Sequence, residues 1–258
     1  MKSVLVTRRK LRYALYAVLL IVGVLLLSFF LHSQSAETGA KPGKKLPIYG
    51  VKTEEKKIAL TFDCAWEASD TDVLLSLLEQ NDVKATLFAT GDWCDRHPED
   101  VKAFSAAGHD IQNHSYAHPH VASISEEKLI EDTKKCDEVI EQLTGKKPTL
   151  YRAPYGEYSD AMLTVFEEKL GHQVIQWGCD SVDWRGREAA DMVETVLKKV
   201  RPGGILLFHN DTKNTPAALR QLLPELKGQG YEFVLVRDLV YPDGYTLDHE
   251  GLQVKVSG

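Results

Sequence analysis

The sequence is poor in cysteine for its length. Its 258 residues include only Cys64, Cys94, Cys136 and Cys179, and no two of them form a CxxC pair. So few cysteines do not define a fold of this size through disulfides, and all but Cys64 are expected to be small buried hydrophobic residues. The chain also has no basic excess, since 31 Lys and Arg stand against 37 Asp and Glu. A nucleic-acid-binding protein carries a basic face, so no nucleic-acid partner is expected.

One long apolar run lies near the N-terminus. Ala14 to Leu31 contains no charged residue, and the four basic residues Arg8, Arg9, Lys10 and Arg12 precede it. As a helix the run is about 27 Å long, close to the hydrocarbon thickness of a bilayer. The positive-inside rule then places residues 1–12 in the cytoplasm and sends the chain outward after a single-pass anchor at 13–31. The small residues at Ser33–Ala36 leave a cleaved signal and a secreted domain as the alternative.

The rest of the chain alternates between two patterns. Residues 32–56 are polar with glycine and proline, and are expected to be an extracytoplasmic linker; residues 241–258 are a polar tail. Short apolar runs that predict strands are Ile58–Phe62, Lys84–Ala89, Asp110–Asn113, Thr149–Arg152, Gln173–Trp177, Ile205–Phe208 and Glu232–Val236. Helical patterns are Asp70–Gln80, Pro98–Ala107, Ser125–Leu143, Ser159–Leu170, Glu188–Val200 and Thr215–Gly228. Strands that alternate with helices predict an α/β fold with parallel strands.

Reactive side chains follow five different predicted strands. They are Asp63, His114, Arg152, the pair Asp180 and Asp183, and His209. An open sheet gathers ligands at one switch point, whereas a barrel brings every strand end to one mouth. The sequence therefore predicts a (β/α) barrel that, with seven strands instead of eight, is distorted or incompletely closed.

Single residues leave their roles open. His114 and His118 are four apart, so both imidazoles can reach one divalent ion if the segment makes a single turn, but two surface histidines also arise at this spacing without a metal. His120, beyond Pro119, is a poorer candidate ligand. Asp63 fits a metal ligand, a general base or a helix cap equally well. Aromatic residues near the strand ends could stack on sugar rings or belong to the core; they are Trp66, Tyr116, Tyr155, Trp177 and Trp184.

Five short motifs together are more specific. TFDCAW, HSYAH, RAPY, DSVDW and LFH occur in this order, each at a predicted strand end. The set resembles the five motifs of the polysaccharide deacetylase family, carbohydrate esterases that share the nodulation-type deacetylase domain. The resemblance covers the chain from about residue 56 and indicates a deacetylase domain at 57–240. The longer sequence around the motifs is most similar to the sporulation-associated branch of this family in Gram-positive bacteria.

The resemblance implies metal-dependent hydrolysis of N-acetyl groups on amino sugars of a cell-wall glycan, with peptidoglycan expected. It implies that Asp63 is the general base, that Arg152 holds its carboxylate, and that His209 is the general acid. By the same resemblance, His114 and His118 bind the divalent metal, and Asp183 orients His209. Tyr155 is implied to supply a backbone N–H to the oxyanion, while Trp184, Leu207 and Tyr155 are expected to contact substrate.

Cys64 departs from the family pattern, because the family usually has a second aspartate there. A Cys64 thiolate could complete the metal site, which would favour zinc as the cofactor. Alternatively, the thiol is a bystander to a weak two-histidine site. A third possibility is a non-catalytic glycan-binding domain with a degenerate metal site. Within the enzymes, an O-acetyl polysaccharide esterase is the alternative.

Overall fold

The computed structural model describes residues 44–256, apart from the side chain of Ala122. The anchor expected at 13–31 and the start of the linker therefore lie outside the described residues. Among the helices that are described, none is both long and apolar enough to cross a membrane.

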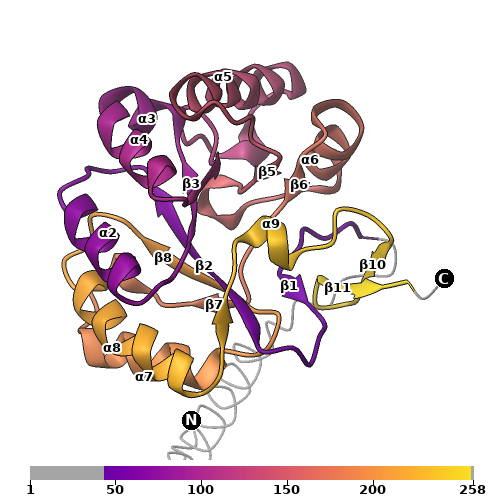
Figure 1. Cartoon of the computed structure of the whole chain (residues 1–258). Helices are drawn as coiled ribbons and strands as arrows, with labels where there is room; N and C mark the ends of the chain where they lie inside the picture. Colours follow the sequence, from indigo (N-terminus) through magenta and orange to yellow (C-terminus); the bar gives the residue numbers. More distant parts are fainter. Residues whose placement is uncertain (1–43, 257–258) are drawn as a thin grey trace, which may run out of the picture. The chain divides into compact units, whose positions relative to one another are not determined.

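A curled sheet of parallel strands forms the centre of the domain, with β2 among its interior strands and helices on its outer face (Figure 1). The spatial order is β6-β5-β4-β3-β2-β8-β7. The strands of this path are β2 (Lys57–Cys64), β3 (Thr86–Ala89), β4 (Asp110–Asn113), β5 (Leu150–Tyr151), β6 (Gln173–Val174), β7 (Cys179–Asp180) and β8 (Ile205–His209). Every pairing along the path is parallel, as the alternating pattern predicts.

The barrel is incompletely closed. β6 and β7 lie at the two ends of the sheet, and no pairing between them is found among residues 44–256. The segment before β1 lies against one of these ends, where the Ile48 N–H donates to the Val174 carbonyl at 2.8 Å. The distorted seven-stranded α/β barrel expected from the sequence is therefore confirmed as a curled, open half-barrel.

Amphipathic helices cover the outer face of the sheet. They are α2 (Thr71–Gln80), α3 (Gly91–Arg96), α4 (Pro98–Ala106), α5 (Glu126–Thr144), α6 (Asp160–Val165), α7 (Ala189–Lys199) and α8 (Thr215–Gly228). The short helix α9 (Val236–Leu239) packs instead on the inner face, against Ala59 and Phe88. Short helical turns occupy Val121–Ser123, Pro154–Gly156, Phe166–Leu170 and Asp183–Arg185. The longest helix, α5, begins where the Ser125 hydroxyl accepts the Lys128 N–H and ends at Gly145 in the left-handed region.

The alternation of side chains along β2 decides which residues reach the interior of the half-barrel. Ile58, Phe62 and Cys64 point outward and belong to the main apolar core under the helices. Thr61 and Asp63 lie on the other face, where both accept hydrogen bonds from Arg152. Because the side-chain period of a strand is two, neighbours such as Asp63 and Cys64 face opposite ways.

Five short strands differ from the sequence prediction. The strand expected at 232–236 is only β9 (Glu232–Phe233), paired with the start of β2, and α9 begins at Val236. β7 is a further, two-residue strand. The linker contains β1 (Gly50–Val51) and the tail contains β10 (Tyr245–Leu247) and β11 (Leu252–Lys255), which form a separate three-stranded sheet. Strands of two to four residues are too short to display a hydrophobic period.

Candidate active site

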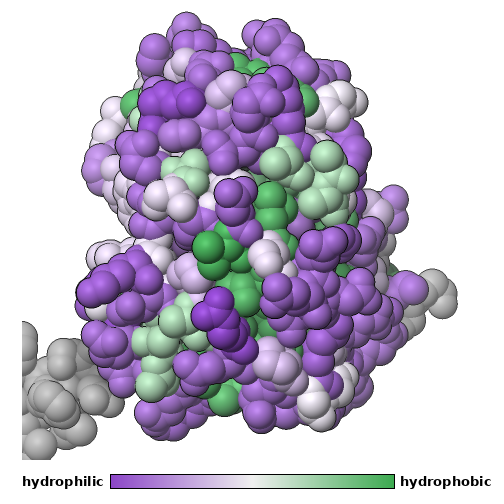
Figure 2. Space-filling model, turned by 60° about the vertical axis from the view of Figure 1, so that its left-hand side comes forward, coloured by the Kyte–Doolittle hydropathy of each residue, from purple (hydrophilic) through white to green (hydrophobic). Residues whose placement is uncertain are grey.

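The carboxyl ends of the strands surround a cavity of about 670 Å³. Residues from the predicted motifs form much of its wall. It is lined by Asp63, Ala65, Trp66, His114, His118, Tyr155, Trp177, Asp180, Trp184, Leu207 and His209. On the face drawn in Figure 2, apolar surface gathers in a band between polar zones. Trp66, Tyr155 and Trp184 are large exposed apolar residues that also belong to the cavity wall.

Asp63 is held as an ionised carboxylate by Arg152. The Arg152 guanidinium is fully buried and donates from Nη1 to Asp63 Oδ1 at 2.7 Å and to the Thr61 hydroxyl at 2.8 Å. Burial alone would raise the pKa of Asp63, but the positive charge of Arg152, reinforced by that of His209, outweighs it and holds that pKa below its usual value. Asp63 is thus an oriented carboxylate that can accept a proton.

His114 presents one ring nitrogen to the cavity. Its Nδ1 lies 2.8 Å from the Arg152 carbonyl oxygen, which can only accept, so Nδ1 carries the proton. The lone pair is therefore on Nε2, which lies 3.6 Å from Asp63 Oδ2. Burial lowers the pKa of His114 and keeps the ring neutral. A backbone carbonyl on the distal nitrogen is the usual arrangement around a metal-binding imidazole.

A tight turn brings His118 next to His114. Ser115 and His118 both have positive φ, and the Ser115 hydroxyl accepts the His118 N–H at 2.9 Å. Asp132 of α5 holds the turn from outside, accepting the Tyr116 and Ala117 N–H groups at 2.8 and 3.1 Å. The two imidazole centroids are 5.0 Å apart. Burial lowers the pKa of His118 to about 4, so this ring is also neutral near pH 7.

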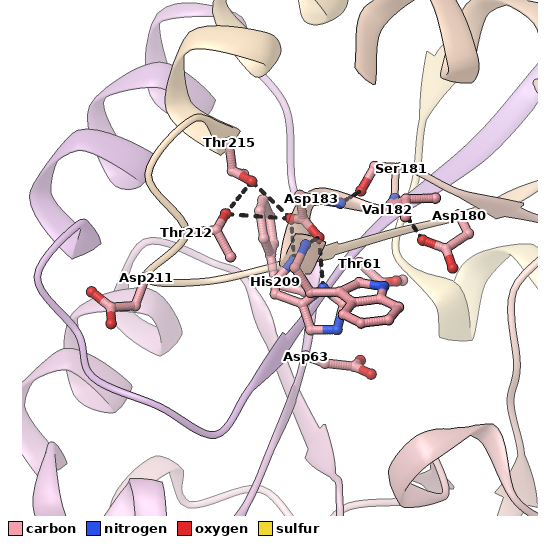
Figure 3. A network of polar contacts seen from close by, with 12 residues as sticks. Thr61, Asp63, Asp180, Ser181, Val182, Asp183, His209, Asp211, Thr212 and Thr215 are labelled. Atoms are coloured by element: carbon pink, nitrogen blue, oxygen red, sulfur yellow. Dashed lines mark hydrogen bonds and ion pairs between the residues drawn. The ribbon is translucent and has the colours of Figure 1, made fainter. Parts of the chain in front are cut away.

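His209 lies in the same cavity and is paired with Asp183. Its Nδ1 donates to Asp183 Oδ1 at 2.7 Å, and its backbone N–H donates to Asp183 Oδ2 at 2.8 Å. Figure 3 shows how Thr215 and Thr212 converge on the same carboxylate, with the Thr215 hydroxyl at 2.7 Å. Burial tends to lower the pKa of His209, but the hydrogen bond and charge of Asp183 raise it above its usual value. His209 is thus suited to donate a proton.

Cys64 is not brought to this cavity. Its side chain is fully buried on the opposite face of β2, in the core under the helices, and its thiol lies 4.0 Å from the Phe62 carbonyl. Burial raises the pKa of the thiol well above its usual value, which disfavours the thiolate that binds metal. The expected sulfur ligand is therefore not supported, because strand alternation turns Cys64 away when Asp63 faces inward.

The remaining predicted residues lie at the cavity but differ in exposure. Leu207 is buried in its wall, whereas Trp184 and Tyr155 are about half exposed. Tyr155 has a positive φ, and its ring contacts both His118 and His120. His120 itself pairs with Glu157 at 2.9 Å, away from the cavity wall.

Sequence reasoning named Trp66 and Asp180 without predicting the contacts that they make, and it did not identify Asp132 or Thr215. Trp66 stacks on the His209 ring with centroids 5.3 Å apart, and Asp180 lines the cavity without belonging to the proton-transfer pair. Asp132 and Thr215 act from helices distant in sequence. The motif DSVDW contained the one available signal for Asp180, since both of its carboxylates follow one strand.

The side chains of this cavity could hold a divalent ion only if some of its coordination positions were left free for water or substrate. Within residues 44–256, no three His, Cys, Asp or Glu side chains converge as a complete protein-only metal site. The His114 imidazole, with its lone pair on the nitrogen near Asp63, and the neutral His118 imidazole nevertheless lie together beside the Asp63 carboxylate. Such a set suits a catalytic ion that keeps exchangeable positions, in contrast to a closed structural site.

Comparison with known proteins agrees with this geometry. Residues 50–175 match the family model described as polysaccharide deacetylase. A peptidoglycan-N-acetylglucosamine deacetylase of Bacillus cereus is 37% identical over 195 residues, which cover 74% of this chain and 91% of the relative. The peptidoglycan-N-acetylmuramic acid deacetylase PdaA of Bacillus subtilis is 33% identical, with 75% of each chain covered.

A solved structure agrees as well. Wild-type BA3943 of Bacillus anthracis, described as a CE4 family pseudoenzyme, has a TM-score of 0.71 and 29% identity, covering 75% of this chain and 68% of that one. These alignments cover about three quarters of the chain. The chain therefore belongs to the polysaccharide deacetylase family.

Proposed function

We propose that this protein hydrolyses N-acetyl groups from amino sugars of a cell-wall glycan, with peptidoglycan as the substrate. The observation that carries the proposal is a matched pair of groups in one cavity: Asp63 is kept ionised by Arg152 and His209 is kept protonated by Asp183. Amide hydrolysis needs a base for the attacking water and an acid for the departing amine. The names of the relatives support the glycan as the substrate.

The reaction follows from the positions of these groups. Asp63 takes a proton from the water whose oxygen attacks the acetyl carbonyl carbon, and Arg152 keeps that carboxylate ionised and oriented. His209 then delivers its proton to the sugar nitrogen as the carbon–nitrogen bond breaks, giving acetate and a free amine. Asp183 remains ionised and holds the imidazole through Nδ1, which leaves Nε2 to face the substrate.

His114 and His118 would hold a divalent ion, for which we propose zinc because imidazole nitrogen suits it. When bound, the ion polarises the acetyl carbonyl and makes water more acidic. The chain itself supplies two neutral rings in a fixed turn, with the proton of His114 on the nitrogen that faces away from the cavity. The Tyr155 backbone N–H and the side chains of Trp184 and Leu207 are proposed to contact the substrate.

We also propose that residues 13–31 anchor the chain in the cell membrane with the deacetylase domain outside. The uncharged run and its one-sided basic flank support this arrangement. Outside the membrane the domain can reach cell-wall glycan. A role in sporulation is proposed only because the sequence around the motifs is similar to the sporulation-associated branch of the family.

Acetate release from N-acetylated peptidoglycan by the full chain tests the proposal. The chain is first treated with a chelator and then supplied with single divalent ions, with His114→Ala as the variant. We expect acetate only after an ion is restored, and little from the variant at any ion concentration. No acetate from the wild type under any ion would leave a glycan-binding domain as the better description.

A further inference from the structure

A strained turn after β7 directs two carboxylates to different places. In the turn Asp180-Ser181-Val182-Asp183, Val182 has φ 60°, in the left-handed region that β-branched residues avoid. Figure 3 shows Asp183 directed toward His209 while Asp180 points away from it. Backbone strain of this kind persists where the surrounding structure requires it, and it is concentrated at functional sites. The position of Asp183 is explained by His209, but that of Asp180 is not.

The hydrogen bonding of the two carboxylates differs sharply. Asp183 is buried and accepts donors at both oxygens, from His209, Trp184 and Thr215. Asp180 is half-buried in the cavity wall, and the one hydrogen bond that the described residues give its side chain comes from the Val182 N–H to Oδ1, at 2.7 Å. An ionised carboxylate can accept about four hydrogen bonds. Asp180 therefore retains acceptor capacity directed at the space that substrate would fill.

The position of Asp180 relative to the reacting groups is fixed by the sheet. It pairs in register with Leu207 of β8, two residues before His209. Leu207, Trp177 and Trp184 surround this part of the cavity with apolar surface. An acceptor within an apolar wall is the usual way in which a pocket orients a polar ligand.

We propose that Asp180 is a substrate-positioning residue, whose free oxygen accepts a hydrogen bond from a hydroxyl of the sugar that carries the reacting acetamido group. The inference rests on the proposed function, since it assigns a contact within the same cavity. It also limits the substrate: a neutral sugar with a free hydroxyl fits this wall, whereas a sugar carrying a carboxylate at that position would be repelled.

Asp180→Asn tests the contact because its carbonyl oxygen can still accept the Val182 N–H. The turn that positions Asp183 is thus retained, while the second acceptor becomes an amide donor. The probe is a soluble N-acetylglucosamine oligomer, together with analogues in which one hydroxyl at a time is replaced by hydrogen. The matched control is Asp191→Asn, an exposed aspartate of α7 away from the cavity wall.

For Asp180→Asn we expect KM to rise about tenfold to a hundredfold, as for the loss of a hydrogen bond to a charged acceptor, while kcat changes much less. One of the deoxy analogues should weaken binding to the wild type but not further weaken binding to the variant. Asp191→Asn should behave as the wild type. An unchanged KM, or a fall confined to kcat, would overturn the proposal in favour of a role in shaping the turn.

Calorimetric binding of the same oligomer separates this inference from the proposed function. If the wild type binds the oligomer without releasing acetate, the hydrolytic proposal fails. A larger dissociation constant for Asp180→Asn than for the wild type would still support the contact. If the wild type releases acetate and Asp180→Asn binds every analogue as the wild type does, the contact is refuted and hydrolysis stands. No binding of the oligomer to the wild type would refute the choice of a neutral sugar.

Discussion

Asp183 sets both the orientation and the charge of His209, so proton donation depends on one buried carboxylate. In its proposed role as general acid, His209 acts in its protonated form, so activity should be lost as pH rises through its pKa, which lies above the usual value of 6.5. Asp183→Asn removes the negative charge and should move this basic limb of kcat/KM to lower pH. We expect kcat/KM at neutral pH to fall about 10²- to 10⁴-fold. A pH profile with an unshifted basic limb would contradict this assignment.

Cys64 gives a second test at the same scale. Cys64→Ala should leave zinc affinity and acetate release close to those of the wild type, because the thiol lies in the core on the outer face of β2. The loss of buried apolar volume should lower the free energy of unfolding by about 1 kcal/mol. Zinc titration and denaturant unfolding of the same variant measure both effects. A large loss of zinc affinity would show that the sulfur reaches the ion.

At the scale of secondary-structure elements, α5 supports the turn between His114 and His118, the proposed metal ligands, although it contributes no ligand itself. The two carboxylate oxygens of Asp132 accept the backbone N–H groups of Tyr116 and Ala117. Asp132→Asn keeps one of these acceptors and removes the negative charge. We expect zinc affinity to fall about 10- to 100-fold, the usual effect of losing a group that supports metal ligands. The control is Glu131→Gln, an exposed neighbour on the same helix. Equal zinc affinity in the two variants would show that the turn keeps its conformation without the Asp132 carboxylate.

The elements differ in how well the sequence predicts them. The six predicted helices all exist, because each repeats apolar residues on one face over at least two turns. α3 was missed because its six residues hold only a short pattern, and β7 because a two-residue strand has no period. Asp63 and His209 were placed correctly at strand ends. The orientation of Cys64 was predicted wrongly. β2 extends as far as Cys64, so this side chain points to the opposite face from that of Asp63.

At the scale of the whole described domain, the first and last segments are joined by the small sheet β1-β11-β10. Gly203 allows β1 to approach β8: it has φ +74°, and a Cβ there would lie 1.9 Å from the Val51 carbonyl oxygen. Gly203→Ala should therefore lower the free energy of unfolding by about 1–3 kcal/mol or more. Gly145→Ala is the matched control, with φ +70° and no atom within 4 Å. Equal losses in denaturant unfolding would mean that the close approach costs nothing.

The parts of the molecule that the sequence did not predict depend on contacts between distant residues. Parallel pairing of β1 with β11, and the hold of Asp132 on the turn between His114 and His118, leave no local pattern to detect. By contrast, reactive residues after successive strands were enough to predict one shared cavity, since parallel strands bring their carboxyl ends to the same side. Sequence reasoning therefore placed Asp63, His209, His114 and His118 at one cavity, together with Arg152 and Asp183, but it did not identify Asp132 or Thr215.

Parallel measurement of acetate and free amine is the most direct test of the central claim. Peptidoglycan and an O-acetylated polysaccharide are each incubated with the full chain and zinc, and both products are quantified. We predict acetate and amino groups in equal amounts from peptidoglycan, and neither product with His209→Ala. Acetate without amine would indicate an O-acetyl esterase. Neither product from the wild type, despite binding to the glycan, would contradict the account.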